Sequence, residues 1–242
     1  MSRRRDDDTL TMQTSEAREQ PVASGTPTLA QSDALKLVAI VAMTIDHIGA
    51  ILLPDLMVLR IVGRIAFPLF AYQLAVGYVH THDVRRYALR LALWGLVSQP
   101  VYMLAVGVGP WTLNIFATLL LGLAAIWGWD HSRWWAVGGA LALAAVQLWF
   151  PSFGPDYGAY GVLLCLVSYV FLSSPSSVAA AHVVLHVLAG IFLWPAQAAA
   201  LLSVPLILHP PRLRVPHLPM LFYAYYPAHL LLLAGIHRML VH

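Results

Sequence analysis

The sequence predicts an all-α protein, a polytopic transmembrane helical bundle of about nine spans (eight to ten). Hydrophobic residues make up 60% of the chain and charged residues 10%, with a mean hydropathy of +0.72. An average soluble domain carries about 25% charged residues. Apolar runs close to the length of a membrane-crossing helix, about 20 residues, alternate with short breaks that contain Pro, Gly or charged residues. Composition and periodic breaks together exclude an ordinary soluble domain.

The first segment, residues 1–33, is polar, charged and rich in Pro, Ser and Thr. It has no apolar core ahead of a cleavage site, so it does not resemble a signal peptide. Because the segment has little apolar surface to bury, we expect a disordered cytoplasmic tail. A single transmembrane helical domain is expected over residues 34–242.

Nine apolar segments follow the tail. They are 35–53, 57–79, 87–108, 111–129, 134–150, 158–173, 178–194, 196–208 and 218–240. The segment 196–208 is short and compatible with a re-entrant helix, so eight and nine spans both fit the pattern.

Basic residues orient the predicted bundle, because cytoplasmic loops of membrane proteins are rich in Lys and Arg. The tail and the start of the first span hold five of them: Arg3, Arg4, Arg5, Arg18 and Lys36. Nine alternating spans place the other basic clusters on the same side: Arg85, Arg86, Arg90, Arg133, Arg212 and Arg214. The sequence therefore predicts a multi-pass membrane protein with a cytoplasmic N-terminus, held in the lipid bilayer.

Two composition features restrict the chemistry. The single cysteine, Cys165, lies in an apolar run, which excludes a disulfide framework and a thiolate metal cluster. The net charge of +3 comes from arginines at span ends, so we expect no nucleic-acid partner. The motifs typical of soluble hydrolases, nucleotide-binding proteins and zinc peptidases do not occur.

Asp46 and His47 are adjacent inside the first apolar segment. The chain has eleven acidic residues, and Asp46 is the one that falls within such a segment. A carboxylate at bilayer depth costs roughly 2.5–3.5 kcal/mol, so it needs a partner and indicates a function. Its neighbour, His47, is a histidine, the residue type whose ordinary pKa lies near neutral pH. At 1.5 Å per residue, Asp46 lies roughly 16 Å along its helix from Leu35, near mid-bilayer.

Further polar side chains from other segments are expected at a similar depth. Arg60 and Arg64 are four residues apart and share a helix face. The others are Gln99, Asn114, Asp156 and Tyr157. Under the predicted topology all of them lie in the outer half of the membrane, which predicts a polar cavity reachable from outside.

Each of these residues also has a purely structural interpretation. Asp46 and Arg64 can form a buried ion pair without a catalytic role. Arg60 can extend to the membrane interface, and Asn114 and Gln99 can form hydrogen bonds between helices. His47 can be an inert, hydrogen-bonded histidine. The group as a whole is more informative than any one member.

Three other histidines are weaker candidates for a functional site than His47. His182 and His186 are four apart, the spacing of metal ligands on a helix. A single such pair without a second pair on another span is a weak signal, so we expect no metal. His229 follows Pro227 within one turn of the last span, where the proline loosens the helix.

Six short blocks occur in order and are similar to one known family. They are 35–37 with IDHIG at 45–49, 60–68, 80–81 with 85–87, 114–116 with 118–122, 156–158 with 160–162, and 226–227 with His229. Together they resemble the TraX family, integral membrane proteins of conjugative elements associated with acetylation of the pilin N-terminus. Two positions depart from it: Val76 and Gln99 stand where many members carry acidic residues.

The resemblance implies an acyltransferase of the bacterial inner membrane that uses acetyl-CoA to acetylate the N-terminal amine of a conjugative pilin. The family is also similar to multi-span acyltransferases that commonly depend on an intramembrane histidine. We expect acetyl-CoA as co-substrate and a pilin subunit as acceptor. The basic residues on the cytoplasmic side suit the CoA phosphates better than Arg60 and Arg64 do, because the latter lie toward the outer face.

Two assignments of the base are open. In the first, His47 is the general base and Asp46 orients it. In the second, His229 is the base and Asp46 pairs with Arg64. Asn114, Gln99 or Tyr157 is expected to stabilise the developing oxyanion.

Two other classes of function compete with the enzyme. In a small proton-coupled transporter, Asp46 and His47 would relay protons. The paired broken helices of many transporters are not evident in the sequence, which disfavours this class. A non-catalytic pilus-assembly factor would use the polar cavity only to hold a pilin.

Overall fold

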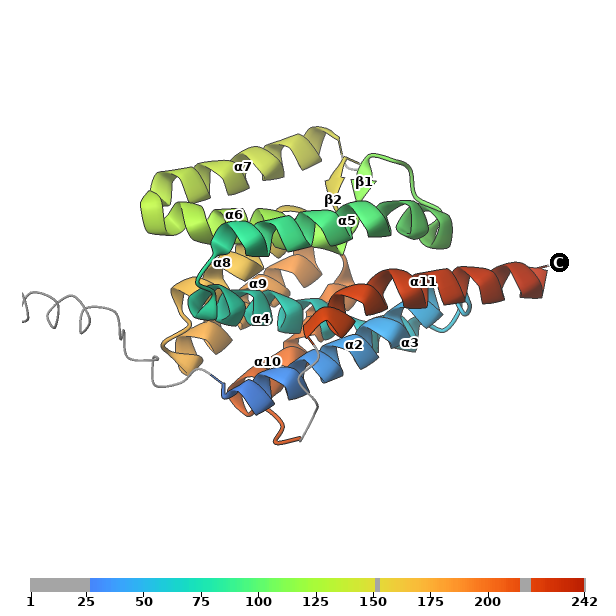
Figure 1. Cartoon of the computed structure of the whole chain (residues 1–242), viewed down its shortest axis with the longest axis horizontal. Helices are drawn as coiled ribbons and strands as arrows, with labels where there is room; N and C mark the ends of the chain where they lie inside the picture. The colour runs from blue at the N-terminus through green and yellow to red at the C-terminus, as the bar shows by residue number, and fades with distance from the viewer. Residues whose placement is uncertain (1–26, 151–152, 214–218, 242) are drawn as a thin grey trace, which may run out of the picture.

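The computed structural model describes residues 27–150, 153–213 and 219–241, and this part of the chain is a helical bundle (Figure 1). The predicted all-α class is confirmed. The helices are α2 (Leu29–Ile51), α3 (Met57–Gly63), α4 (Ala66–His80), α5 (Val84–Val106), α6 (Ile115–His131), α7 (Arg133–Trp149), α8 (Gly158–Val170), α9 (Pro175–Phe192), the 3-10 helix η1 (Pro195–Leu202), α10 (Ser203–Leu208) and α11 (Pro219–Val241). Residues 1–26 of the predicted tail, and Arg214, lie outside the described residues.

Several helices have the length and composition of membrane spans. Among the described residues, four stretches are long and apolar enough: Gln31–Ile51, Met57–His80, Val84–Val106 and Pro175–Phe192. The apolar helices Ile115–His131, Gly158–Val170 and Pro195–Leu208 are shorter. Large apolar side chains such as Leu96 and Trp134 are exposed, as lipid-facing residues are. These features support a membrane protein, but the prediction of about nine spans is not confirmed.

Helix α2 begins earlier than the expected boundary between tail and domain. Thr28 and Gln31 form a capping box, in which each side chain bonds the backbone N–H of the other residue. This arrangement satisfies N–H groups that the first turn leaves without partners. Residues 29–33, expected to be disordered, are therefore the first turn of α2.

The predicted span 57–79 is divided into α3 and α4 at Arg64 and Ile65. Pro68 explains the break, because it lacks the backbone N–H that would bond the carbonyl of Arg64 in a continuous helix. In the first turn of α4 the proline is tolerated, and Arg64 occupies the junction. The break brings the end of α3 against α2, with which it is in extensive contact.

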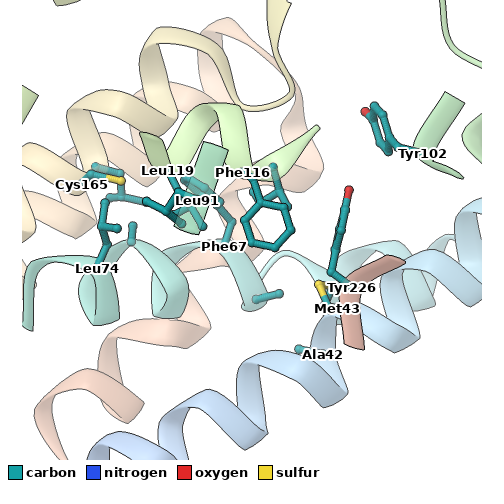
Figure 2. Close-up of a cluster of buried hydrophobic side chains, with 14 of the residues drawn as sticks. Ala42, Met43, Phe67, Leu74, Leu91, Tyr102, Phe116, Leu119, Cys165 and Tyr226 are labelled. Atoms are coloured by element: carbon teal, nitrogen blue, oxygen red, sulfur yellow. The ribbon is translucent and has the colours of Figure 1, made fainter. Parts of the chain in front are cut away.

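Helix α4 lies at the centre of the bundle and contacts α2, α6, α8 and α10. Figure 2 shows part of the core around it, where Phe67 and Leu74 meet side chains of neighbouring helices. Gly122 of α6 permits the close approach of α8, since a Cβ there would come within 2.6 Å of the Cys165 sulfur. Cys165 is thus a packing residue.

A short parallel pairing joins the segments that precede α6 and α8. β1 (Thr112–Leu113) pairs with β2 (Gly154–Pro155), and the backbone N–H of Asp156 donates to the carbonyl of Leu113 at 2.9 Å. Gly154 adopts a φ of 120°, a conformation that favours glycine. The pairing fixes Asp156 at the start of α8.

Helix α11 lies beside α2 although the two are distant in sequence (Figure 1). Pro227 lies inside α11 and Pro100 inside α5. A proline within a helix removes one backbone hydrogen bond and bends the helix. The approach of α11 to α2 brings His229 to the half of α2 that carries His47.

Candidate functional site

The carboxylate of Asp46 is held between two arginines. Its Oδ2 accepts from Nη1 of Arg60 and its Oδ1 from Nη2 of Arg64, both at 2.6 Å. Arg60 Nη1 also donates to the Asp46 backbone carbonyl at 3.1 Å. Asp46 and Arg64 are both 7% exposed. The i, i+4 spacing of Arg60 on α3 and Arg64 at its C-terminal cap therefore places both arginines on one carboxylate, as the shared helix face predicted.

Gly63 makes this ion cluster possible. A Cβ at this position would overlap the side chain of Asp46, because the backbone of Gly63 lies directly against that side chain of α2. Gly49 of α2 is equally tight, since a Cβ there would come within 2.7 Å of the Leu59 Cβ. Two glycines thus allow α2 and α3 to approach closely.

Arg64 connects the ion cluster to the far side of the bundle. Its Nη1 donates to Gln197 Oε1 at 3.4 Å, and Gln197 Nε2 donates to the Tyr160 hydroxyl at 3.2 Å. The guanidinium also lies over the rings of Trp194 and Tyr157, at 5.4 and 6.0 Å from their centroids. These contacts fix the guanidinium plane.

His47 is paired with His229 of α11. The two nitrogens, Nδ1 of His47 and Nε2 of His229, are 2.8 Å apart. His229 Nδ1 is in turn 2.8 Å from the carbonyl oxygen of Tyr225. Tyr225 also bonds Thr44 of α2 through its hydroxyl, at 2.8 Å. Two side-chain hydrogen bonds therefore connect α2 and α11 in this region.

The contacts of His229 assign the tautomers of both rings when they are neutral. A carbonyl oxygen only accepts, so Nδ1 of His229 carries the proton and its Nε2 is an acceptor. His47 Nδ1 must then donate to it, which leaves the lone pair on His47 Nε2. No hydrogen bond between described residues uses that nitrogen. His47 Nε2 is thus available as a base.

The structure separates Asp46 from His47. Adjacent residues of an α-helix point about 100° apart, so their side chains do not face each other. Asp46 points to α3, and His47 points to α11. The expected contact between Asp46 and His47 is therefore not present: His47 contacts His229, and Asp46 pairs with Arg60 and Arg64.

A cavity of about 260 Å³ lies at this junction, and we name it the arginine cavity. Six of the nine residues predicted from the sequence line it: Asp46, His47, Arg60, Arg64, Asp156 and Tyr157. His229 is behind His47 and 5% exposed, and it does not line the cavity. The convergence of polar groups from distant segments that the sequence predicted is thus present for these six.

Asp156 and Tyr157 form the opposite wall of the cavity. The Tyr157 ring stacks on Phe67 with centroids 3.9 Å apart. Asp156 Oδ1 accepts from the Tyr102 hydroxyl at 3.2 Å. Burial raises the pKa of the Asp156 carboxyl above its ordinary value, and the hydrogen bond from Tyr102 and the arginines opposes that shift. Asp156 therefore differs from Asp46, which has two direct arginine partners.

Gln99 and Asn114 lie apart from the arginine cavity and hold the turn between α5 and α6. Asn114 Nδ2 donates to Gln99 Oε1 at 2.8 Å and to the carbonyl of Gly95 at 2.7 Å. Gln99 Nε2 donates to the Thr112 carbonyl at 2.8 Å. Asn114 Oδ1 caps α6 by accepting from Phe116 N. Their contacts match the interhelical interpretation.

His182 and His186 are fully buried on α9 at a distance from the cavity. His182 Nε2 contacts Ser168 Oγ at 2.9 Å, and His186 Nδ1 contacts the Tyr160 hydroxyl at 2.8 Å. In the part of the chain that the structure describes, the remaining nitrogens, His182 Nδ1 and His186 Nε2, have no hydrogen-bond partner. Within the described residues, no group of three His, Cys, Asp or Glu side chains could hold a metal ion.

Comparison with known proteins identifies the family. The family model described as TraX protein matches residues 31–237, most of the chain and the whole of the site. The chain belongs to the TraX family. Among curated TraX proteins, one from Escherichia coli is 35% identical over 142 residues, which are 57% of this chain and 55% of that protein. The chain therefore spans about half the length of the curated relatives it matches.

Two relatives outside the named TraX proteins are also similar. An uncharacterized protein of Rickettsia prowazekii (strain Madrid E) is 31% identical over 141 residues, 57% of this chain and 54% of that protein. A probable fimbrial assembly protein, FimC of serogroup H1 from Dichelobacter nodosus, is 38% identical over 72 residues, 28% of this chain and 30% of that protein. No solved structure matches the chain.

The site of this TraX family member includes residues that the sequence did not single out. Tyr102, Tyr160, Trp194 and Gln197 line the arginine cavity, and Gly63 permits its ion cluster. Gln197 lies in a short apolar segment, and a polar side chain in such a segment could have been recognised from the sequence as a candidate site residue. Gly63 and Tyr160 fall within blocks that resemble the TraX family, but no role was assigned to them. Tyr102 and Trp194 are residue types that are common in apolar segments, so the sequence carried no signal for them.

Proposed function

We propose that the protein is a membrane-embedded acyltransferase that acetylates the N-terminal amine of a conjugative pilin, with acetyl-CoA as donor. Membership of the TraX family and the similarity to a protein named as a probable fimbrial assembly protein support a pilus context. The observation that carries the chemical part is the His47–His229 pair, which leaves one basic nitrogen at a cavity.

The pair is suited to general-base catalysis. His47 Nε2 accepts a proton from the attacking amine while its Nδ1–H remains bonded to His229. The positive charge that develops on His47 is stabilised through that bond and the bond from His229 to the Tyr225 carbonyl. A histidine in this arrangement is oriented without a carboxylate.

The transfer balances with groups at hand. The amine nitrogen forms a bond to the thioester carbonyl carbon, and its proton passes to His47 Nε2. The carbon–sulfur bond then breaks, and the departing thiolate of CoA takes the proton, so the products are the N-acetylated pilin and CoA. Tyr157, which lines the cavity, is the candidate donor to the oxyanion, since Gln99 and Asn114 are engaged elsewhere.

The ion cluster has a separate role in this proposal. The ion cluster contains two positive charges, on Arg60 and Arg64, and one negative charge, on Asp46. It therefore carries a net positive charge beside the cavity. A positive field disfavours an ammonium ion and favours the neutral amine that the reaction needs. The same field opposes protonation of His47, so the hydrogen bond to His229 must offset it. Asp46 keeps the two arginines in place and is a positioning residue.

The proposed location is the bacterial inner membrane with a cytoplasmic N-terminus. In that orientation acetyl-CoA enters from the cytoplasm, and the pilin presents its N-terminus from the other face. Basic residues concentrated at one end of the predicted spans support this orientation. The two substrates then meet near His47.

The test is intact mass spectrometry of a pilin co-expressed with the full-length protein. Wild type should add one acetyl group to the pilin N-terminus, and His47→Gln should abolish the adduct. His237→Gln, at an exposed position of α11, is the matched control and should retain it. An unmodified pilin with wild type, or a full yield of adduct with His47→Gln, contradicts the proposal.

A further inference from the structure

A second cavity, of about 370 Å³, lies at the end of the bundle where α2 and α5 begin and α4 ends. We name it the Gln73 cavity after a side chain in its wall. Its volume is within the range of small-ligand sites. It follows α4 from Phe70 to His80, ten residues or about 15 Å along the helix axis. It is therefore long enough for an extended chain.

The two cavities share a wall. Met43, Phe70, Ile115 and Tyr226 line both of them. Figure 2 shows Met43 beside Tyr226 at this point. His47 is one helical turn beyond Met43, and its ring centroid is 6.0 Å from that of Tyr226. A group at the inner end of the Gln73 cavity is thus separated from His47 by these side chains, of which Met43 is flexible.

The wall of the Gln73 cavity holds a polar group with unused capacity. Gln73 is 7% exposed, and its Oε1 accepts from Ser32 Oγ at 2.6 Å. Its Nε2 has no hydrogen-bond partner among the described residues. An unpaired buried amide donor is costly, so it indicates a ligand that supplies an acceptor. The neighbouring wall is apolar and includes Leu74 and Leu91.

Cations lie at the mouth of the cavity. Lys36 and Arg90 line it, and Lys36 is held by Asp33 at 3.0 Å. Arg90 is exposed, and its guanidinium lies 5.5 Å from the Tyr87 ring centroid. Arg90 is also one of the arginines on the predicted cytoplasmic side that are expected from the sequence to bind the CoA phosphates. The cavity thus has a cationic mouth, one buried amide donor and an apolar inner end.

We propose that the Gln73 cavity binds the phosphopantetheine arm of the acyl donor, an inference that rests on the proposed acyltransferase function. The phosphates lie at Lys36 and Arg90, and Gln73 Nε2 donates to an amide carbonyl of the arm. The thioester lies against Met43 and Tyr226, next to His47. Donor and acceptor then occupy two cavities on opposite sides of one wall.

This ligand matches the polar groups at one end of the cavity and the apolar side chains at the other. Lys36 and Gln73 both contact the start of α2, through Asp33 and Ser32, and Met43 lies ten residues beyond Asp33. A phosphopantetheine thioester has phosphate at one end, amides in the middle and an acyl group at the other end. A lipid acyl chain would match the apolar inner part but leave Gln73 Nε2 without a partner. CoA and a pantetheinylated carrier protein present the same arm, so the experiment must separate these two sources.

The test measures binding of CoA and of holo acyl carrier protein to the purified full-length protein in nanodiscs, without acceptor. Gln73→Met and Arg90→Gln should each weaken CoA binding by about tenfold, through loss of an amide contact and a phosphate contact. Arg238→Gln, an exposed cation of α11 outside both cavities, is the matched control and should bind like wild type. Thermal unfolding checks that each variant is folded.

The outcomes separate this inference from the proposed function. Retention of CoA binding by His47→Gln, with loss of binding in Arg90→Gln, supports the site whatever the pilin assay shows. Unchanged binding in both Gln73→Met and Arg90→Gln overturns the inference even if acetylation occurs. Displacement of a copurified fatty acid, without any CoA or carrier-protein binding, overturns it in favour of a lipid site.

Discussion

Two pairs of histidines lie close together among the described residues, and they are arranged in opposite ways. His47 and His229 are 182 residues apart in sequence and share a hydrogen bond of 2.8 Å. His182 and His186 are neighbours on one helix face, yet each bonds a different hydroxyl and not the other histidine. The first pair reaches a cavity through His47, and the second is fully buried.

The difference shows what sequence spacing can and cannot indicate. Two histidines four residues apart on a helix suggest a shared ligand, but here their free nitrogens are enclosed by packing. Basicity at a cavity requires a ring oriented by a partner and open on its other side. That arrangement depends on the packing of α2 against α11, which no local pattern encodes.

The largest expected effect distinguishes the two pairs directly. His229→Phe removes the acceptor of His47 Nδ1–H and should lower the acetylation rate by about 100-fold, a typical share of general-base catalysis. His186→Phe should lower it by less than about threefold. Rates of acetyl transfer to a synthetic pilin N-terminal peptide measure both. Equal losses in the two variants would show that the pairs do not differ in function.

A second variant of His229 tests whether it acts by orienting His47. His229→Gln retains an amide oxygen that can accept from His47 Nδ1, so it should restore part of the rate lost in His229→Phe. The pH dependence of the rate should also change in His229→Phe, because the base has lost its partner. An unchanged pH profile with a reduced rate would indicate a purely structural role.

The next largest effect tests the close packing beside the first pair. Gly63→Ala places a methyl group where the Asp46 side chain lies and should cost about 1–3 kcal/mol of stability, with loss of transfer activity. Gly138→Ala in α7 meets open space and should stabilise the protein by about 0.5–1 kcal/mol. Thermal unfolding in detergent compares them. A stable, active Gly63→Ala would contradict the ion cluster.

Part of the site was predictable because it rests on helix geometry alone. The shared face of Arg60 and Arg64 follows from their i, i+4 spacing, and the cost of a buried carboxylate predicted a partner for Asp46. The hydrogen bond between His47 and His229 was not predictable, because it depends on contact between helices at opposite ends of the chain. The break before Pro68 had a local cause, but its consequence for Arg64 required the fold.

The fold shows the same division. Apolar length and composition predicted the helices, while the number that can cross a membrane was not confirmed. The expected segment 196–208 is divided between η1 and α10, and η1 supplies Gln197 to the arginine cavity. Gln99 and Asn114 satisfy each other and the backbone, an outcome that depends on the pairing of β1 with β2.

A smaller effect tests the connection between the two regions. Tyr160→Phe removes the hydroxyl that contacts Gln197 and His186, and should cost about 1 kcal/mol of stability. Transfer should fall by about threefold, since Gln197 holds Arg64 less firmly. Tyr169→Phe, which loses a surface contact to Asp130, is the matched control. A Tyr160→Phe variant as active and stable as that control would show that the regions are independent.

The smallest effect is expected for a substitution of His182, in the His182–His186 pair. His182→Leu replaces a ring that carries an unpartnered Nδ1, and Ser168 Oγ keeps its bond to the Leu164 carbonyl at 2.7 Å. Since no polar group loses its last partner, stability should stay within about 1 kcal/mol of wild type and transfer should be unchanged. Unfolding and peptide acetylation check this. A loss of transfer as large as that of His229→Phe would mean that the buried pair takes part in the reaction, because packing alone cannot account for it.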